Sequence, residues 1–309
     1  MAHIYLYSPS SAQRDRPSFR RGIERLQALG HRVEVDPDAL RAHMRFAGDD
    51  DTRLAAIHRA AASGADIAMI SRGGYGLTRL LGRIRYRELA RAVARGTQFV
   101  GFSDFTALQC ALYAATGAGS WIGPALQDDF GKPEQVDEIL QDCFQDLALG
   151  QGEGAGWRLP AERGARATAA AAALPARPIR RATLWGGNLC VLTALVGTPY
   201  LPAVRGGVLV LEDVAEHPYR IERMLTQLLH AGVLGAQRAI VLGQFTNYQL
   251  APNDKGYTLR TVVDWLRSQL RVPVLSGLPL GHVATKVVLP FGRPVDLLVD
   301  GRDALLYWG

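Results

Sequence analysis

Short β-prone runs alternate with helical patterns through the first part of the chain, and this alternation restricts the possible folds more than any other feature. Strands are predicted at residues 3–7, 31–35 and 66–71, with helices between them at 19–29 and 49–63. Strands and helices that alternate in this way form βαβ units, whose strands lie parallel. Helices then cover both faces of the sheet. The sequence therefore predicts an α/β protein with a parallel sheet in its N-terminal part.

A change of composition near residue 150 divides the chain. A length of 309 residues suggests about two domains. The segment 151–182 collects glycine, alanine, proline and arginine, which is typical of a linker or crossover. We predict an N-terminal α/β domain over 1–150, a linker or crossover over 151–182 and a second domain over 183–309.

The net charge of +6 does not by itself indicate a nucleic-acid partner, because the arginines are scattered and the cluster between Arg163 and Arg181 is typical of a solvated linker. No apolar run approaches the ~18 residues that a membrane span needs, and the N-terminus lacks signal-peptide features. Cys110, Cys143 and Cys190 are far apart, so we expect buried thiols without disulfide or zinc. These features favour a cytoplasmic protein with no nucleic-acid and no membrane partner.

The run from Gln98 to Thr106 is predicted to be a buried strand that turns sharply at Gly101 and continues as a helix. Ser103 lies at the turn, where a hydroxyl can be exposed above a helix N-terminus, as in the nucleophile elbow of serine hydrolases. Phe105 stands where the G-x-S-x-G pattern has its second glycine. Ser103 or Asp104 could instead cap the helix, since serine and aspartate are common at helix starts.

A second turn, Arg72-Gly73-Gly74-Tyr75-Gly76, directly follows the predicted strand 66–71. Ligands of open α/β sheets bind beyond the carboxyl ends of the strands, and glycines there let backbone N–H groups approach an anion. The loop is therefore a candidate oxyanion or carboxylate site, although glycine clusters also serve ordinary tight turns. It matches neither of the common nucleotide-binding glycine motifs.

Two further polar residues follow strands in the second half. Glu212 ends the β-prone run 207–211, and His282 lies in a turn beyond the run 272–275. Ser103, Glu212 and His282 stand in the order nucleophile, acid, base, which is the order of α/β-hydrolase triads. The order alone does not distinguish a catalytic His282 from a structural one.

Five separated motifs resemble those of the LD-carboxypeptidase family, and the resemblance covers nearly the whole chain apart from 161–182. The motifs are Ser71-Arg72-Gly73-Gly74-Tyr75-Gly76, G-F-S-D-F-T-A at 101–107, L-W-G-G-N-L at 184–189, L-E-D with E-H-P-Y-R between 211 and 220, and Gly281-His282. The resemblance implies a flavodoxin-like N-terminal domain that carries the nucleophile and a β-rich C-terminal domain that carries the acid and the base.

The family resemblance also implies the chemistry. It indicates a serine carboxypeptidase that removes the terminal D-alanine from the murein tetrapeptide L-Ala-D-Glu-meso-diaminopimelate-D-Ala during cytoplasmic peptidoglycan recycling. Members commonly form homodimers, and the reaction needs neither metal nor cofactor. Carried onto this chain, the triad is Ser103, Glu212 and His282, with Asp213 and Glu216 as the other carboxylates to test.

The remaining site residues follow from what such a reaction needs. We expect the backbone N–H groups of Gly74 and Asp104 to form the oxyanion hole. The residues expected to contact the substrate are Arg72, Gly73, Trp185 and Asn188. The terminal carboxylate is expected on the glycine loop, on Arg72 or on Arg220.

Two other functions stay open at this point. Relatives with the same fold confer microcin immunity by hydrolysing peptide-nucleotide antibiotics, and an aromatic pocket that includes Trp185 would favour that activity. The chain could also be a non-catalytic binder of murein peptides. Incubation with tetrapeptide distinguishes a binder from a peptidase, because only a peptidase changes the mass of the peptide.

Overall fold

The structure is a computed structural model that describes residues 1–162, 174, 175 and 177–309, and the chain divides into two compact units. The first unit comprises Met1–Gly152, Pro199–Pro202 and Ala284–Gly292, and the second comprises Glu153–Thr198, Ala203–Val283 and Arg293–Gly309. Two short segments from late in the chain thus belong to the first unit. This differs from the predicted division at 150 and 183, and for the segment Ala284–Gly292 the reason is that its strand, Leu289–Phe291, pairs with the sheet of the first unit.

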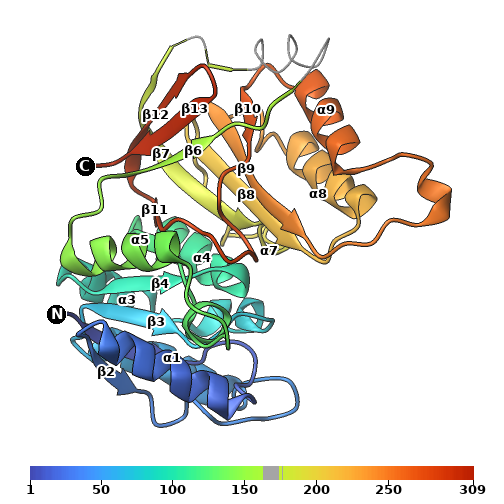
Figure 1. Ribbon diagram of the computed structural model, residues 1–309. Helices are drawn as coiled ribbons and strands as arrows, with labels where there is room; N and C mark the ends of the chain where they lie inside the picture. The colour runs from blue at the N-terminus through green and yellow to red at the C-terminus, as the bar shows by residue number, and fades with distance from the viewer. Residues whose placement is uncertain (163–173, 176) are drawn as a thin grey trace. The chain divides into compact units, whose positions relative to one another are not determined.

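The first unit contains a six-stranded sheet in the order β11-β5-β4-β3-β1-β2 (Figure 1). The strands are β1 (His3–Tyr7), β2 (Arg32–Val35), β3 (Ile67–Ile70), β4 (Gln98–Gly101), β5 (Ser120–Ile122) and β11 (Leu289–Phe291). The first five are parallel, and β11 pairs antiparallel with β5. The order 2-1-3-4-5 is the flavodoxin-like one. The predicted fold class of the N-terminal part is confirmed.

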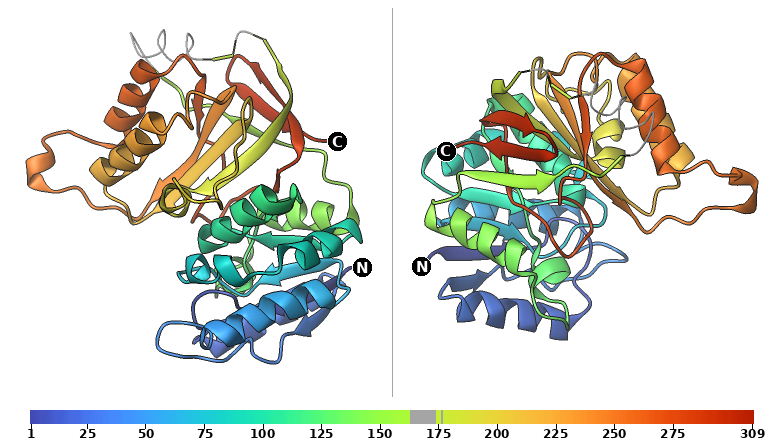
Figure 2. Two further views of the ribbon diagram at one scale, coloured as in Figure 1. Left: turned by 180° about the vertical axis from the view of Figure 1, so that it is seen from behind. Right: turned by 45° about the horizontal axis from the view of Figure 1, so that its top comes forward.

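Helices cover both faces of this sheet, with α1 and α5 on one face and α2, α3 and α4 on the other (Figures 1 and 2). The helices are α1 (Arg16–Ala28), α2 (Asp50–Ala62), α3 (Tyr86–Ala94), α4 (Thr106–Thr116) and α5 (Glu138–Leu149). Short helical turns lie at Leu77–Arg79, Leu81–Arg83, Ser103–Phe105 and Leu126–Phe130. The carboxylates of Asp15, Asp49 and Asp137 each accept a backbone N–H from the first turn of a helix, as N-cap residues do.

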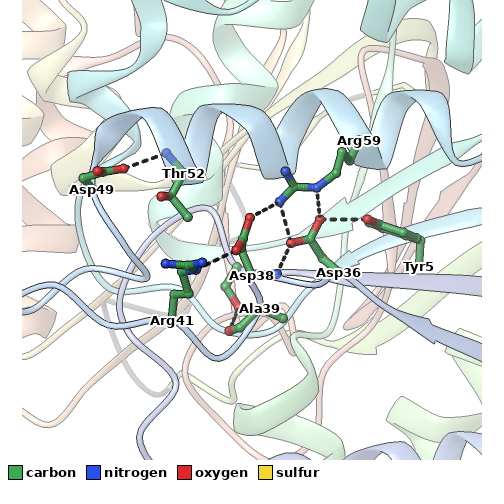
Figure 3. A network of polar contacts seen from close by, with 9 residues as sticks. Tyr5, Asp36, Asp38, Ala39, Arg41, Asp49, Thr52 and Arg59 are labelled. Atoms are coloured by element: carbon green, nitrogen blue, oxygen red, sulfur yellow. Dashed lines mark hydrogen bonds and ion pairs between the residues drawn. The ribbon is translucent and has the colours of Figure 1, made fainter.

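A network of ion pairs fixes α2 to the end of β2 in the first unit (Figure 3). Asp36 follows β2, and its buried carboxylate accepts two hydrogen bonds from Arg59 of α2, at 2.7 and 2.8 Å, and one from Tyr5 of β1, at 2.7 Å. Burial alone would raise the pKa of Asp36, but the hydrogen bonds from Arg59 and Tyr5 outweigh it and lower the pKa. The network holds the carboxyl edge of the sheet, where ligands of this fold bind.

The second unit is built on a seven-stranded sheet in the order β10-β9-β8-β7-β12-β13-β6. Its strands are β6 (Gly154–Arg158), β7 (Ile179–Asn188), β8 (Val208–Val214), β9 (Ala239–Thr246), β10 (Val274–Ser276), β12 (Pro294–Asp300) and β13 (Asp303–Tyr307). Its helices are α7 (Leu189–Ala194), α8 (Pro218–His230) and α9 (Leu259–Gln269), with a short turn at Pro252–Asp254. The strands β7 to β10 are parallel, and the pairs made by β12, β13 and β6 are antiparallel. The second β-rich domain is confirmed.

The prediction of a linker over 151–182 is wrong at both of its ends. Strand β6 pairs with β13, and β7 begins at Ile179, so both lie in the second sheet. The sequence pattern does not indicate β6 as a strand, because Gly154 and Gly156 lack the β-branched side chains that are typical of strands. The alanine run 167–173, with Arg163 and Arg166, lies outside the described residues.

The helices of the described chain are all too short or too polar to cross a membrane.

Candidate active site

Ser103 is held in a left-handed backbone conformation directly after β4. Its φ is 62°. Residues other than glycine seldom adopt this left-handed conformation, which costs about 1–2 kcal/mol. Only glycine fits at position 101 before this turn, because a Cβ on Gly101 would lie 2.8 Å from side-chain atoms of Ile70 and Phe105. A strained serine between a buried strand and a helix is the arrangement of a nucleophile elbow. The predicted strand, turn and helix are therefore all present.

The glycine loop lies against this serine within the first unit. A Cβ on Gly73 would be 2.9 Å from Cβ and 3.0 Å from Oγ of Ser103, so only glycine fits. Gly74 has a φ of 115°, and a Cβ there would lie 2.0 Å from Oγ of Ser11. Since both loops follow parallel strands, they meet at the carboxyl edge of the sheet. The structure thus brings the predicted nucleophile and the predicted anion loop together.

Asp104 points away from its own helix. Neither the turn at 103–105 nor α4 has a side-chain cap. The buried carboxylate instead accepts hydrogen bonds from Oγ of Ser10 at 2.7 Å and from the backbone N–H of Leu77 at 3.0 Å. Burial raises the pKa of Asp104, and these hydrogen bonds together with the charge of Arg53 oppose the rise. The helix-cap interpretation of Asp104 is wrong.

The second unit holds the acid and the base in direct contact. Glu212 lies near the end of β8 with 1% of its surface exposed, and its Oε2 is 2.9 Å from Nδ1 of His282. Gly281 lets the imidazole come this close, because its φ is 131° and a Cβ there would lie 3.0 Å from the same Oε2. The other oxygen of Glu212 accepts a hydrogen bond from Asn188 at 3.1 Å. This carboxylate therefore holds Nδ1 of His282, as the acid of a catalytic triad holds its histidine.

The other two candidate acids make different contacts. The carboxylate of Asp213 accepts hydrogen bonds from Asn188 and from the backbone N–H of Cys190. Glu216 forms an ion pair with Arg220 one turn along α8, at 2.5 Å. Of the three carboxylates, only Glu212 has a described contact with the imidazole, which supports its choice as the acid.

Two of the residues expected to contact the substrate are buried and hydrogen-bonded within the second unit. Trp185 is only 1% exposed, and its indole N–H donates to Gln237 at 3.0 Å, so it is a core residue of the second sheet. Asn188 is 5% exposed, donates to Glu212 and Asp213, and caps α7 by accepting from Val191. Trp185 thus points into the core of the second unit, and Asn188 contacts the acid Glu212.

The arginines proposed for the substrate carboxylate differ in their surroundings. Arg72 is half-buried beside the glycine loop, and its Nη1 lies 3.5 Å from the carbonyl oxygen of Ala12. Arg220 is already paired with Glu216. Arg72 therefore belongs to the loop that packs against Ser103 in the first unit.

A pH dependence of stability follows from Asp213. Burial, together with the neighbouring charge of Glu212, raises the pKa of Asp213 from 3.8 to about 6. The native state therefore binds this proton more tightly than the unfolded state, so the Asp213 contribution to the free energy of unfolding falls as the pH rises through that window. A shift of this size corresponds to roughly 3 kcal/mol.

We expect wild type to lose roughly 2 kcal/mol of this relative to Asp213→Asn between about pH 4 and about pH 7, measured by urea unfolding. The comparison removes the contributions of groups that titrate identically in both proteins. Parallel pH profiles for the two proteins would contradict this assignment.

Family models match both parts of the chain. The model described as the LD-carboxypeptidase N-terminal domain matches residues 4–123, and that of the LD-carboxypeptidase C-terminal domain matches residues 181–297. The matched ranges include all three predicted triad residues. Together they cover well over half of the chain.

Individual relatives agree with these matches. A crystal structure of muramoyltetrapeptide carboxypeptidase from Oxalobacter formigenes is 35% identical with a TM-score of 0.86, over 98% of this chain and 97% of that one. Murein tetrapeptide carboxypeptidase of Pseudomonas aeruginosa is 31% identical over 87% of this chain and 82% of its own length. The microcin C7 self-immunity protein of Escherichia coli is 26% identical over 68% of this chain and 65% of its own length.

Proposed function

We propose that this chain, which belongs to the LD-carboxypeptidase family, removes the terminal D-alanine from murein tetrapeptide. The chain is a serine carboxypeptidase. Two observations support the proposed mechanism best. Ser103 in the first unit has a strained backbone, and the buried Glu212 in the second unit is hydrogen-bonded to His282. We propose that these two halves act together on one peptide bond.

In the proposed reaction, Oγ of Ser103 attacks the carbonyl carbon on the L-centre of diaminopimelate. Nε2 of His282 takes the hydroxyl proton, while Nδ1 stays bonded to Glu212. The carbonyl oxygen becomes an oxyanion, which the backbone N–H groups of Gly74 and Asp104 stabilise. The C–N bond then breaks, and His282 gives the proton to the leaving amine of D-alanine.

A water molecule completes the cycle. His282 takes a proton from the water, whose oxygen attacks the ester carbonyl on Ser103. The ester bond breaks, and the proton returns to Oγ, which releases the tripeptide and restores the enzyme. Each step uses the same base and the same oxyanion donors.

We propose that the free carboxylate of D-alanine is held by Arg72 and the backbone N–H groups of the glycine loop. The close packing of Gly73 on Ser103 supports this, because a carboxylate bound there lies one residue from the attacked bond. The cytoplasmic location, the role in peptidoglycan recycling and the homodimer that the family resemblance implies are part of the proposal.

The test of this function is the mass of murein tetrapeptide after incubation with wild type and with Ser103→Ala, both in the presence of a chelator. We expect wild type alone to release one alanine. Tetrapeptide that stays intact with wild type would refute the proposed activity, and release by both proteins would refute Ser103 as the nucleophile.

The two other functions receive less support. Similarity to a microcin C7 self-immunity protein supports the first of them, but Trp185, whose exposure would favour an aromatic pocket, is buried. An aminoacyl-adenylate analogue in the same assay decides the question, since faster loss of the analogue than of the tetrapeptide would favour it. A non-catalytic binder would leave both compounds intact.

A further inference from the structure

The carboxylate of Asp104 forms hydrogen bonds with two other segments of the first unit. It accepts hydrogen bonds from Oγ of Ser10, in the loop after β1, and from the backbone N–H of Leu77, which directly follows the glycine loop. The residue is 2% exposed, so water does not replace these bonds. Because a buried carboxylate makes charge-assisted hydrogen bonds, each is about twice as strong as a bond between neutral groups.

The glycine loop needs such a restraint. Gly74 and Gly76 have φ values of 115° and 134°, and a glycine backbone has many alternative conformations. Stabilisation of an oxyanion depends on donors that are already aimed before the reaction. The hydrogen bonds that hold the loop include those from Tyr75 N–H to Oγ of Ser11, from Ser11 N–H to the carbonyl of Gly73, and from Leu77 N–H to the carboxylate of Asp104.

We propose that the side chain of Asp104 is a positioning residue that fixes the glycine loop against Ser103, so that the N–H of Gly74 stays aimed at the developing oxyanion. This inference rests on the proposed function for the identity of the oxyanion donors. It gives Asp104 two separate tasks, a backbone N–H in the oxyanion hole and a carboxylate that places the second donor.

The chain offers a matched control for this role. Ser10→Ala removes one hydrogen bond from the same buried oxygen but leaves the bond to Leu77 and therefore the loop in place. Asp104→Leu has a similar size and accepts no hydrogen bond, so it releases the loop. Asp104→Asn keeps one neutral acceptor and should lie between these two variants.

Loss of an aimed oxyanion donor acts on the transition state. We expect kcat on the tetrapeptide to fall about 10²–10³-fold in Asp104→Leu and about 10-fold in Asp104→Asn, with KM changed less than about threefold. For Ser10→Ala we expect kcat within about threefold of wild type. Thermal unfolding of all three variants shows how much each one loses in stability.

A purely structural role predicts that kcat follows stability in all three variants, and that result would overturn the inference. A large rise in KM at constant kcat would also overturn it. The rate at which a fluorophosphonate labels Ser103 is measured in parallel and requires no peptide. If wild type is labelled but leaves the tetrapeptide intact, the proposed function fails, and the ranking of labelling rates among the variants still decides the role of Asp104.

Discussion

Glu212→Gln should lower kcat by about 10³–10⁴-fold, because the glutamine cannot satisfy both of its neighbours. Glu212 accepts a hydrogen bond at each oxygen, one from Asn188 and one from His282. Glutamine has only one acceptor oxygen. If that oxygen stays with Asn188, the amide NH₂ faces Nδ1 of His282 and forces the imidazole into the other tautomer. The ring then presents Nε2–H to the serine and cannot take its proton.

The matched control for this prediction is Glu216→Gln. Glu216 pairs with Arg220 near the start of α8, and such a pair contributes little to stability. We therefore expect its kcat to stay within about threefold of wild type. Steady-state release of D-alanine by both variants checks the assignment, and a Glu212→Gln enzyme that keeps most of its turnover while Glu216→Gln loses it would reverse the choice of acid.

Lys286→Met should lower the free energy of unfolding by about 3–5 kcal/mol. Lys286 is 2% exposed, and its Nζ lies 2.7 Å from Oδ1 of Asp129 and 3.9 Å from the centre of the Phe102 ring. Removal of the ammonium leaves Asp129 charged and buried without its partner. This ion pair anchors the segment 284–292, which carries β11, within the first unit.

A double variant separates the loss of the pair from the cost of an unpaired charge. Lys286→Met combined with Asp129→Asn removes both charges and keeps an acceptor for the backbone N–H of Ala125. We expect this double variant to recover more than half of the stability lost by Lys286→Met, as measured by denaturant unfolding. A single variant that loses less than about 1 kcal/mol would show that the pair behaves like an exposed one.

Loss of the Lys286–Asp129 ion pair should also lower kcat. Phe102, whose ring contacts Lys286, immediately precedes Ser103. His282 lies four residues before Lys286, and four residues of extended chain reach at most about 14 Å. A loosened 284–292 segment should therefore disturb both the serine turn and the tether of the histidine. Lower kcat in Lys286→Met at temperatures where the protein stays folded would support this connection.

The sequence predicts the elements that depend on local pattern. The alternation of apolar runs gives the parallel sheet of the first unit, and Gly101 followed by Ser103 gives the turn after β4. The order of the strands follows from family resemblance, since periodicity does not specify which strands are neighbours. The unit boundaries are missed because β6 is rich in glycine and because β11 returns to the first sheet from late in the chain.

The site is predictable to the same extent. Ser103, Glu212 and His282 are recognisable because each lies near or beyond the carboxyl end of a strand, which is where such folds place ligands. The roles of Asn188 and of the Asp104 carboxylate depend on partners distant in sequence, such as Ser10, 94 residues away from Asp104. No pattern within a single motif indicates these contacts. Burial of Trp185 likewise depends on Gln237 and on the packing of the second sheet.

The central claim is that an imidazole of the second unit activates a hydroxyl of the first. The most direct measurement is the rate at which a fluorophosphonate labels wild type, Ser103→Ala and His282→Ala, with the labelled peptide identified by mass spectrometry. The account predicts a label on Ser103 alone, none on Ser103→Ala, and a rate at least about 10²-fold lower in His282→Ala, since a base typically contributes this much. Equal labelling of wild type and His282→Ala, or a label on another residue, would contradict it.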